Sequence, residues 1–386
     1  MKLTVKDLFD IPICREFKLI AGSGGLSRPV NGTEILDFEF IKGASMSRDE
    51  IFIGKTLVLT SFLFAKDDPE LITDAIRRLY DLNISCMAYK PVLVKSLPRE
   101  ALDFADSHDF PILEFGGDEF FEDIIMAIRH ELEEGEDIAA LEKEFAGLLA
   151  EELSSREESR LCKKINSDFK RFIRAVYIKD SCHDSDESLI ALVRKMSSME
   201  KLRKKAALCK FRGGYFVFLS QDIPDSERFR ALLTDVFVTL QIDKDCVRCG
   251  VSSMLPAGEH FGKTVREAFW ACNIAVMEDV PVCLYSDTGI YRLLVPEIQS
   301  RNLQDYMEEY LKPLSGDKHE LLDTACTYIL AHGDLEETSR RLFCHKNTVR
   351  YRLSKLHELL DPGVNDKEFY ENLSMAVRIY MLLKYK

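Results

Sequence analysis

The residues best suited to chemistry lie near the C-terminus, between Arg340 and Lys355. This stretch holds six basic side chains and no acidic one, although the chain of 386 residues has a formal net charge of -13. The six are Arg340, Arg341, Lys346, Arg350, Arg352 and Lys355. A local block of positive charge in an acidic protein predicts a contact surface for a polyanion.

The same stretch has the periodicity of an amphipathic helix. On a wheel of about 100° per residue, one side is an apolar stripe and the other is polar. The stripe consists of Val349, Leu353, Leu356 and Leu360, and the polar side of Asn347, Arg350, Tyr351, Ser354 and Lys355. Arg352 lies at the border between the two sides, so its partner could be either a DNA phosphate or a carboxylate of the protein itself.

The polar side suits the major groove of DNA. Asn can bond bidentately to adenine and Arg to guanine, whereas Tyr, Ser, Thr and Lys suit phosphates. A solvated helix in a helical bundle is the alternative. The predicted DNA-contacting residues are His345, Lys346, Asn347, Thr348, Arg350, Tyr351, Arg352, Ser354, Lys355, Arg340 and Arg341.

Helices predicted around this stretch would position it. They cover residues 302–314, 321–330, 335–343 and 368–385, with Gly333 as a helix stop and Asp334 as an N-cap. Two short helices joined by residues 344–346, the second beginning at Asn347 or Thr348, predict a helix-turn-helix. We therefore expect an all-α DNA-binding domain over residues 301–386.

The first 130 residues alternate short apolar runs with amphipathic stretches. Predicted strands cover 55–61, 84–89, 92–94 and 111–115, and predicted helices 69–82 and 98–108. This alternation predicts an α/β domain over residues 1–130.

Residues 131–168 are expected to form a helical linker. Ile138, Leu141, Phe145 and Leu148 step by 3, 4 and 3 residues, which gives a seam of two heptads. Such a seam is either a dimerisation helix or a surface helix packed on its own domain.

Residues 169–300 predict a second mixed domain. Strands are expected at 172–178, 215–219, 247–252 and 282–286, helices at 185–209, 226–241 and 259–277, and a hairpin turn at Gly213-Gly214. This order suggests an α+β sheet covered on one side by helices.

At this point a family resemblance can be stated. Residues 338–353 look like the C-terminal helix-turn-helix signature of the purine catabolism regulator (PucR) family of bacterial transcription factors, with Ser339 for the usual alanine and Cys344 for the usual aliphatic residue. Residues 310–314 and 320–325 sit where that family has its characteristic segments. Residues 50–60 are similar to the strand motif of its N-terminal ligand-sensing domain. Residues 250–252 and 264–269 resemble its central domain, which is related in fold to diguanylate cyclases.

The resemblance implies a multidomain α/β plus all-α protein: an N-terminal α/β sensor, a central degenerate GGDEF-like domain and a C-terminal helix-turn-helix. It implies a ligand-responsive transcriptional regulator, not an enzyme, of a catabolic operon for a purine or related metabolite. The implied partners are double-stranded operator DNA, an unidentified small-molecule effector, a second copy of the chain or a higher homo-oligomer and, as a further candidate, RNA polymerase. No cofactor is implied.

One string favours a different class of function. Residues 116–120 spell Gly-Gly-Asp-Glu-Phe, the diguanylate cyclase signature, so a cyclic-dinucleotide enzyme or binder is the alternative. The following residues have helical periodicity instead of forming a hairpin, so Asp118 is expected to cap a helix. The hairpin at Gly213-Gly214 takes the topological place of that motif but lacks its carboxylates, and we expect no cyclase activity.

The remaining features exclude several other sites. The eleven cysteines are scattered as buried reduced thiols would be, and Cys246 and Cys249 are expected on opposite faces of one strand, so we expect no metal site. Residues 21–26 lack the lysine of a phosphate loop and are read as a surface turn. With neither a signal-peptide h-region nor a run of about 18 apolar residues, the chain is expected in the cytoplasm without a membrane span.

Overall fold

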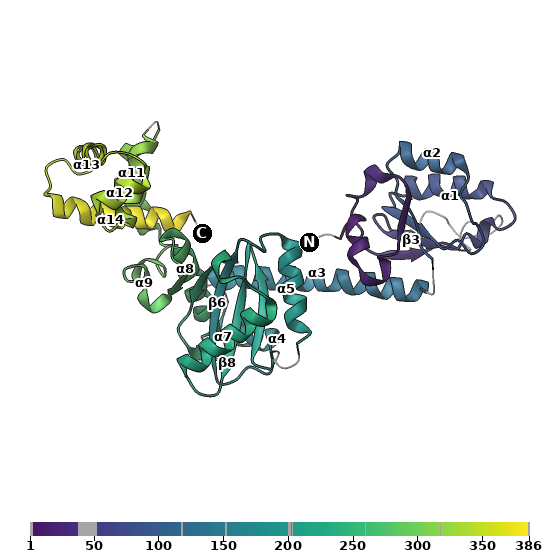
Figure 1. The fold of residues 1–386 in the computed structure, drawn as a ribbon, viewed down its shortest axis with the longest axis horizontal. Coiled ribbons are helices and arrows are strands. Elements are labelled where there is room, and N and C mark those ends of the chain that lie inside the picture. The colour runs from purple at the N-terminus through teal and green to yellow at the C-terminus, as the bar shows by residue number, and fades with distance from the viewer. Residues whose placement is uncertain are drawn as a thin grey trace. The chain divides into compact units, whose positions relative to one another are not determined.

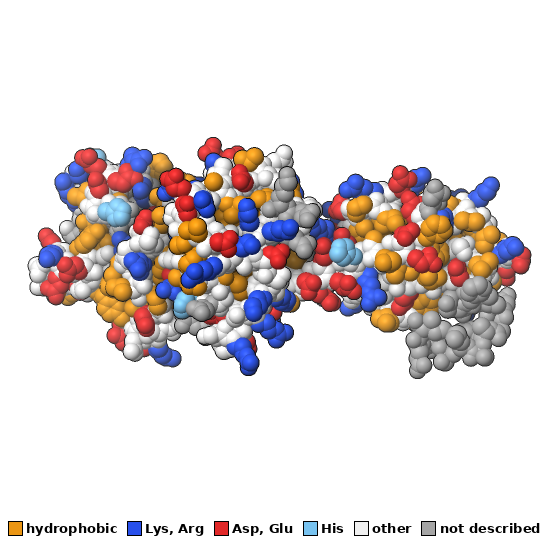
Figure 2. All heavy atoms as spheres, turned by 90° about the horizontal axis from the view of Figure 1, so that it is seen from below, with side chains coloured by type: hydrophobic (Ala, Val, Ile, Leu, Met, Phe, Trp, Pro, Cys, Tyr) orange, Lys and Arg blue, Asp and Glu red, His pale blue; other side chains and the backbone are white. Residues whose placement is uncertain are grey.

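The chain forms two units, residues 1–140 and 141–386 (Figure 1). The computed structural model describes residues 3–37, 52–116, 119–150, 153–199, 202, 204–258, 260–316 and 318–384. Within these ranges, no helix combines the length and the apolar composition needed to cross a membrane. Basic and acidic side chains are interspersed over the face shown in Figure 2.

A five-stranded sheet organises the N-terminal unit. Its order is β1 (Lys18–Ala21), β5 (Ile112–Glu114), β4 (Cys86–Tyr89), β3 (Leu57–Thr60) and β2 (Thr33–Ile35). Neighbours from β2 to β5 are parallel and β1 is antiparallel to β5. Helices α1 (Glu70–Asp81) and α2 (Arg99–Ser107) follow β3 and β4, as predicted. The predicted strand at 92–94 is wrong, because Val92 N bonds back to Lys90 O in a turn and its side chain faces solvent.

Both faces of this sheet are covered. Helices α1 and α2 pack on one face. The short helices η1 (Lys6–Asp10) and η2 (Pro12–Cys14) and the first turns of α3 (Phe121–Leu149) pack on the other. The glycine-rich stretch forms η3 (Ser23–Gly25), and Gly22 precedes it at φ +75°, where a Cβ would come within 2.0 Å of Phe110 O. The stretch predicted as a surface turn is therefore partly buried against residues 106–111.

The second unit contains a sheet ordered β11 (Val282–Leu284), β9 (Val247–Val251), β6 (Phe172–Asp180), β8 (Gly214–Gln221) and β7 (Ala206–Phe211), with β10 (Leu255–Pro256) paired to β6. With α5 (Asp186–Ser197) and α7 (Ser226–Leu240), strands β6 to β9 form a β-α-β-β-α-β unit. All pairs within this unit are antiparallel. Its strand order is that of a ferredoxin-like split βαβ arrangement.

Two expectations about this sheet are wrong. The helix predicted over 185–209 ends at Ser197, because residues 206–211 pair with β8 from Ala206 opposite Leu219 to Phe211 opposite Gly214. Helices also cover both faces instead of one. Helices α5 and α7 pack on one face, and α8 (Phe261–Met277), α4 (Ser155–Ile165) and the last turns of α3 pack on the other.

The predicted hairpin is present between β7 and β8. Its turn is Arg212-Gly213, with Arg212 at φ +50°. The turn itself has no acidic residue, as expected. Glu142 of α3 approaches from outside it, and its Oε1 accepts hydrogen bonds from Arg212 N at 2.8 Å and from Lys210 Nζ at 2.9 Å.

The heptad seam of α3 is occupied within its own chain. Phe145 and Leu148 are fully buried in the core between the central sheet and α8. The Phe145 ring lies 5.1 Å from the ring of Phe216, with the two rings stacked. These two seam positions belong to the domain core, so they are not a free surface for a dimer.

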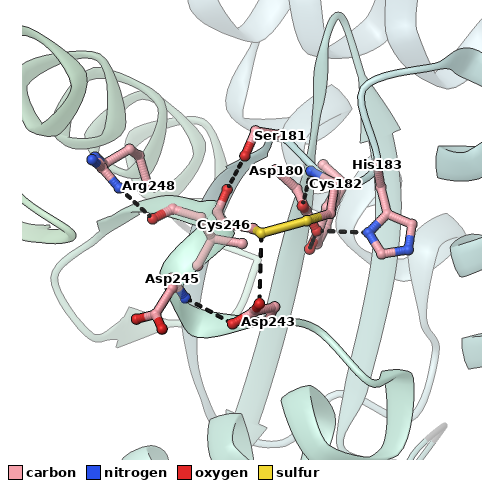
Figure 3. Close-up of a disulfide and its surroundings, with 10 residues drawn as sticks. Asp180, Ser181, Cys182, His183, Asp243, Asp245, Cys246 and Arg248 are labelled. Atoms are coloured by element: carbon pink, nitrogen blue, oxygen red, sulfur yellow. Dashed lines mark hydrogen bonds and ion pairs between the residues drawn. A yellow bond between two sulfur atoms is a disulfide. The ribbon is translucent and has the colours of Figure 1, made fainter.

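Two cysteines form a cross-link that the sequence reading missed. Cys182 and Cys246 are joined by a disulfide, with their Cα atoms 6.0 Å apart (Figure 3). Cys246 closes the 3-10 helix η5 (Lys244–Cys246), and the strand that was expected to contain it begins at Val247. The bond joins the turn after β6 to the turn before β9, where Asp180 and Val247 are paired. The other nine cysteines are free thiols.

Replacing Phe145 tests the intramolecular packing of the α3 seam. Phe145→Ala should lower the free energy of unfolding by ~3–5 kcal/mol, because it removes a buried ring from a packed core. Urea unfolding followed by far-UV circular dichroism measures this loss. Ile138→Ala, in the same seam but only half-buried, is the matched control and should cost clearly less. Equal losses for the two variants would contradict the packing.

Candidate nucleic-acid interface

Four helices build the C-terminal part around the predicted site (Figure 1). They are α11 (His319–Leu330), α12 (Leu335–Arg341), α13 (Lys346–Leu360) and α14 (Asp366–Leu383). The predicted helix at 302–314 forms α10 (Arg301–Leu311) and the short η7 (Lys312–Leu314). Because a four-residue turn joins α12 to α13, the pair has the helix-turn-helix connection expected from the sequence.

Side-chain caps fix where the two short helices begin. Asp334 Oδ1 accepts hydrogen bonds from the N–H groups of Glu336 and Glu337 at 2.7 and 3.0 Å, which confirms its predicted capping role. Gly333 precedes it at φ +81°, a conformation that suits glycine. His345 caps α13, with Nδ1 accepting from Asn347 N at 3.2 Å. The helix therefore starts at Lys346, one residue before the earlier of the two predicted starts, Asn347 and Thr348.

The apolar stripe of α13 is buried as predicted. Val349 and Leu356 are fully buried, and Leu353 and Leu360 are half-buried against the same core. That core is supplied by α11 and α14, among others through Leu321, Ala325, Ile329, Leu373 and Val377. Because this stripe has to face the core, α13 can take only one orientation about its own axis.

The predicted reading face is exposed on the other side of α13. Asn347, Arg350, Tyr351, Ser354 and Lys355 are all solvent-exposed, with Tyr351 at 66%. The Arg350 guanidinium donates to Asn347 Oδ1 at 3.3 Å, so the two candidate base readers are neighbours. The structure therefore brings these five residues together on one surface. His345 is exposed at the start of the same helix, where Lys346 and Thr348 are half-buried.

Arg352 is not part of this face. Its side chain is only 20% exposed, and Nη2 donates to Glu320 Oε2 on α11 at 2.8 Å. Nη1 also lies 3.4 Å from Thr324 Oγ1. The helical wheel allowed two partners for Arg352, and in the structure it binds the carboxylate of the protein itself.

Acidic residues just upstream neutralise part of the basic block. The Glu337 carboxylate accepts hydrogen bonds from both Arg340 and Arg341 at 2.6 Å, and these bonds lower the pKa of Glu337. Lys346 Nζ lies 2.8 Å from Glu336 Oε1. Both acids precede the stretch in which the cations were counted.

The sequence did not indicate one exposed aromatic residue next to α13. Phe343 lies in the turn between α12 and α13 at φ +50° and is 97% exposed. The sequence reading placed it in the last turn of a helix. Its exposure could have been suspected from the sequence, because this aromatic residue lies outside the apolar stripe and directly precedes the basic helix.

The expected capping role of Asp118 in the alternative site at 116–120 falls outside what the structure describes. Gly117 and Asp118 lie outside the described residues. Phe120 is exposed, and α3 begins at Phe121, so a helix follows the string. In the part of the chain that the structure describes, no three His, Cys, Asp or Glu side chains are grouped as metal ligands would be.

Two protein-family models match the chain. Residues 7–132 match the purine catabolism regulatory protein-like (PucR) family, and residues 321–379 match the PucR C-terminal helix-turn-helix domain. The chain therefore contains an N-terminal domain of the PucR family and a PucR-type C-terminal helix-turn-helix domain. The second match contains α12, the turn and α13, and the first contains the whole sheet of the N-terminal unit.

Two known proteins are similar to parts of this chain. The purine catabolism regulatory protein of Bacillus subtilis (strain 168) is 35% identical over 85 residues, which span 21% of this chain and 16% of that protein. The crystal structure of a regulator of polyketide synthase expression from Bifidobacterium adolescentis is 16% identical. The match covers 62% of this chain and 98% of the solved chain. Its TM-score is 0.25, a value at which no common fold is established.

Two arginines of α13 should separate stability from binding. Arg352→Ala removes the contact with Glu320 and should lower the free energy of unfolding by roughly 0.5–1 kcal/mol, the size expected for a partly exposed ion pair. Arg350→Ala, in the same helix, removes an exposed side chain that bonds to the uncharged Asn347 and should leave stability unchanged. Urea unfolding of both variants measures the difference. A larger loss for Arg350→Ala would show that the two roles are exchanged.

Proposed function

We propose that this chain is a ligand-responsive transcriptional regulator that binds double-stranded operator DNA through α13. The observation that carries the proposal is the exposure of Asn347, Arg350, Tyr351, Ser354 and Lys355 on one side of a helix whose other side is buried. In this proposal Asn347 and Arg350 read base edges in the major groove, and Tyr351, Ser354, Lys355, His345, Lys346 and Thr348 contact phosphates.

Arginines 340 and 341 contribute in a second step. They are held by Glu337 in the free protein, and we propose that they exchange this carboxylate for DNA phosphates on binding. A homodimer would place two α13 helices on half-sites about 34 Å apart. Since Phe145 and Leu148 are buried, the dimer contact has to use a surface other than that part of the α3 seam.

We further propose that the N-terminal unit senses a small-molecule effector and that the target is a catabolic operon. The name of the Bacillus subtilis relative supports a purine or related metabolite as effector. RNA polymerase is a candidate partner of the DNA-bound protein. These proposals rest on the family and on the relative's name.

The central domain is proposed to be a degenerate cyclase-like scaffold. Its β7–β8 hairpin turns at Arg212-Gly213, and the charged groups beside it are the cation Lys210 and the carboxylates of Glu142 and Asp186 that pair with it. Carboxylates engaged by a lysine are poorly placed to hold a divalent metal. The competing proposal, a cyclic-dinucleotide enzyme or binder using residues 116–120, is less well supported because those residues precede a helix.

Substitutions on the exposed face of α13 test DNA binding directly. Arg350→Ala and Asn347→Ala should each weaken specific binding by ~1–3 kcal/mol, because each removes a bidentate contact to a base. Fluorescence anisotropy with labelled DNA from the promoter region of the neighbouring genes measures affinity at fixed salt. Arg228→Ala, an exposed arginine on α7, is the matched control and should bind normally. Unchanged affinity in both α13 variants would refute the assignment of the site.

Phe343 is proposed to contact DNA beside α13. Phe343→Ala should weaken DNA binding by about 1 kcal/mol, roughly half the value for burying a whole Phe side chain. The folded protein should be equally stable, since the ring is almost entirely exposed. Anisotropy and thermal unfolding give the two measurements. Val238→Ala, an exposed apolar residue on α7, controls for surface hydrophobicity, and a loss of the same size there would contradict a specific role for Phe343.

A further inference from the structure

A cavity of about 400 Å³ lies within the second unit, away from α13. Its wall comes from the end of α3, from one side of α8 and from residues 285–299. Its volume is in the range of sites for small molecules, which is roughly 300–1,000 Å³. The side chains with chemical character are Lys263, Arg266, Glu267, Trp270, Tyr285 and Arg292.

The charge of the wall favours an anion. Three cations face one acid, and the acid is already engaged. Glu267 is almost fully buried, its Oε2 accepts from Ser253 N at 2.7 Å, and its Oε1 lies 3.9 Å from Lys263 Nζ. Arg266 Nη1 is fixed by a hydrogen bond of 2.8 Å to Leu148 O, which orients its guanidinium at the wall. Arg292 is solvent-exposed at the rim.

Apart from Gln299, the rest of the wall is apolar and aromatic. Trp270 and Tyr285 are buried residues whose surfaces border the cavity, together with Val295 and Ile298. Burial raises the pKa of the Tyr285 phenol, so at neutral pH the group keeps its proton and can donate it in a hydrogen bond. An occupant would therefore meet three cations, a phenol donor and an apolar surface.

We propose that this cavity binds a small organic anion, with a carboxylate or phosphate group toward Arg292 and Lys263 and an apolar or aromatic body against Trp270. Guanidinium groups match the planar or forked oxygens of both anions, and ammonium groups add a point charge. The apolar wall excludes a simple inorganic ion as the best ligand, because such an ion would leave that wall in contact with water.

The position of the cavity gives binding a route to the DNA-binding helices. One side is formed by the end of α3, and another by residues 292–299, which lead directly into α10. Helix α10 contacts α14, where Tyr306 Oη lies 3.5 Å from Asn372 O. An anion that bridges α8 and residues 292–299 can therefore bias the packing of α10 on α14. If it does so, DNA binding changes the affinity of the anion by the same factor.

Trp270 gives a direct readout because it is the one tryptophan of the chain. Phenyl phosphate and benzoate are titrated into the full-length protein while tryptophan fluorescence is followed, with benzyl alcohol and benzylamine as neutral and cationic analogues. At least one anion should give a saturable change with a Kd below ~1 mM. The two analogues should give none in that range. The anion that binds more tightly identifies the preferred head group.

Two variants decide whether the cavity is responsible. Arg292→Ala should weaken the better anion roughly tenfold or more, as expected for loss of a charged hydrogen bond. Arg301→Ala, an exposed arginine on α10 outside the wall, should bind it normally. The proposal is overturned if neither anion binds with a Kd below ~1 mM, if benzyl alcohol binds as well as the anions, or if Arg292→Ala has no effect. No DNA is present, so failure here leaves the proposed function of α13 untouched, and Arg350→Ala should bind the anion normally.

Discussion

Burial of the apolar stripe of α13 is the interaction on which the rest of the site depends. Val349 and Leu356 have no exposed surface, and Leu356 belongs to a core that includes residues of α11 and α14. Rotating the helix by one residue, about 100°, would bring polar side chains into that core at a cost of several kcal/mol. The set of exposed residues is therefore a consequence of the core and is fixed before any partner arrives.

A second constraint acts through charge. Arg352 is turned inward by Glu320, and Arg340 and Arg341 are turned toward Glu337. The basic block thus has three parts: Arg352, which pairs with Glu320 of α11, the cations held by Glu336 and Glu337, and Arg350 and Lys355 on the exposed face of α13. Counting charges along the sequence overstates the positive surface, because the count leaves out acids that lie a few residues away.

The sequence predicted the features that depend on local patterns, such as helical periodicity and helix caps. The face of α13 follows from a period of 3.6 residues, and Asp334 and Gly333 mark a helix boundary through their own backbone chemistry. Residues 206–211 could not be assigned in this way, because their strand is decided by pairing with β8. The Cys182–Cys246 bond spans 64 residues, and the cavity wall combines α3, α8 and residues 285–299. Such contacts depend on the sheet that brings distant segments together, and no local pattern encodes them.

The pairing of the arginines with Glu337 has a consequence for how a regulator of this kind would search a genome. Under the proposed function, Glu336 and Glu337 lie beside the DNA-facing helix in an already acidic chain, so random duplex is met by carboxylates as well as cations. Sequence-independent affinity comes mainly from neutralised phosphates. Lowering it reduces the share of molecules trapped on the millions of non-cognate sites, and the fraction free to find the operator rises.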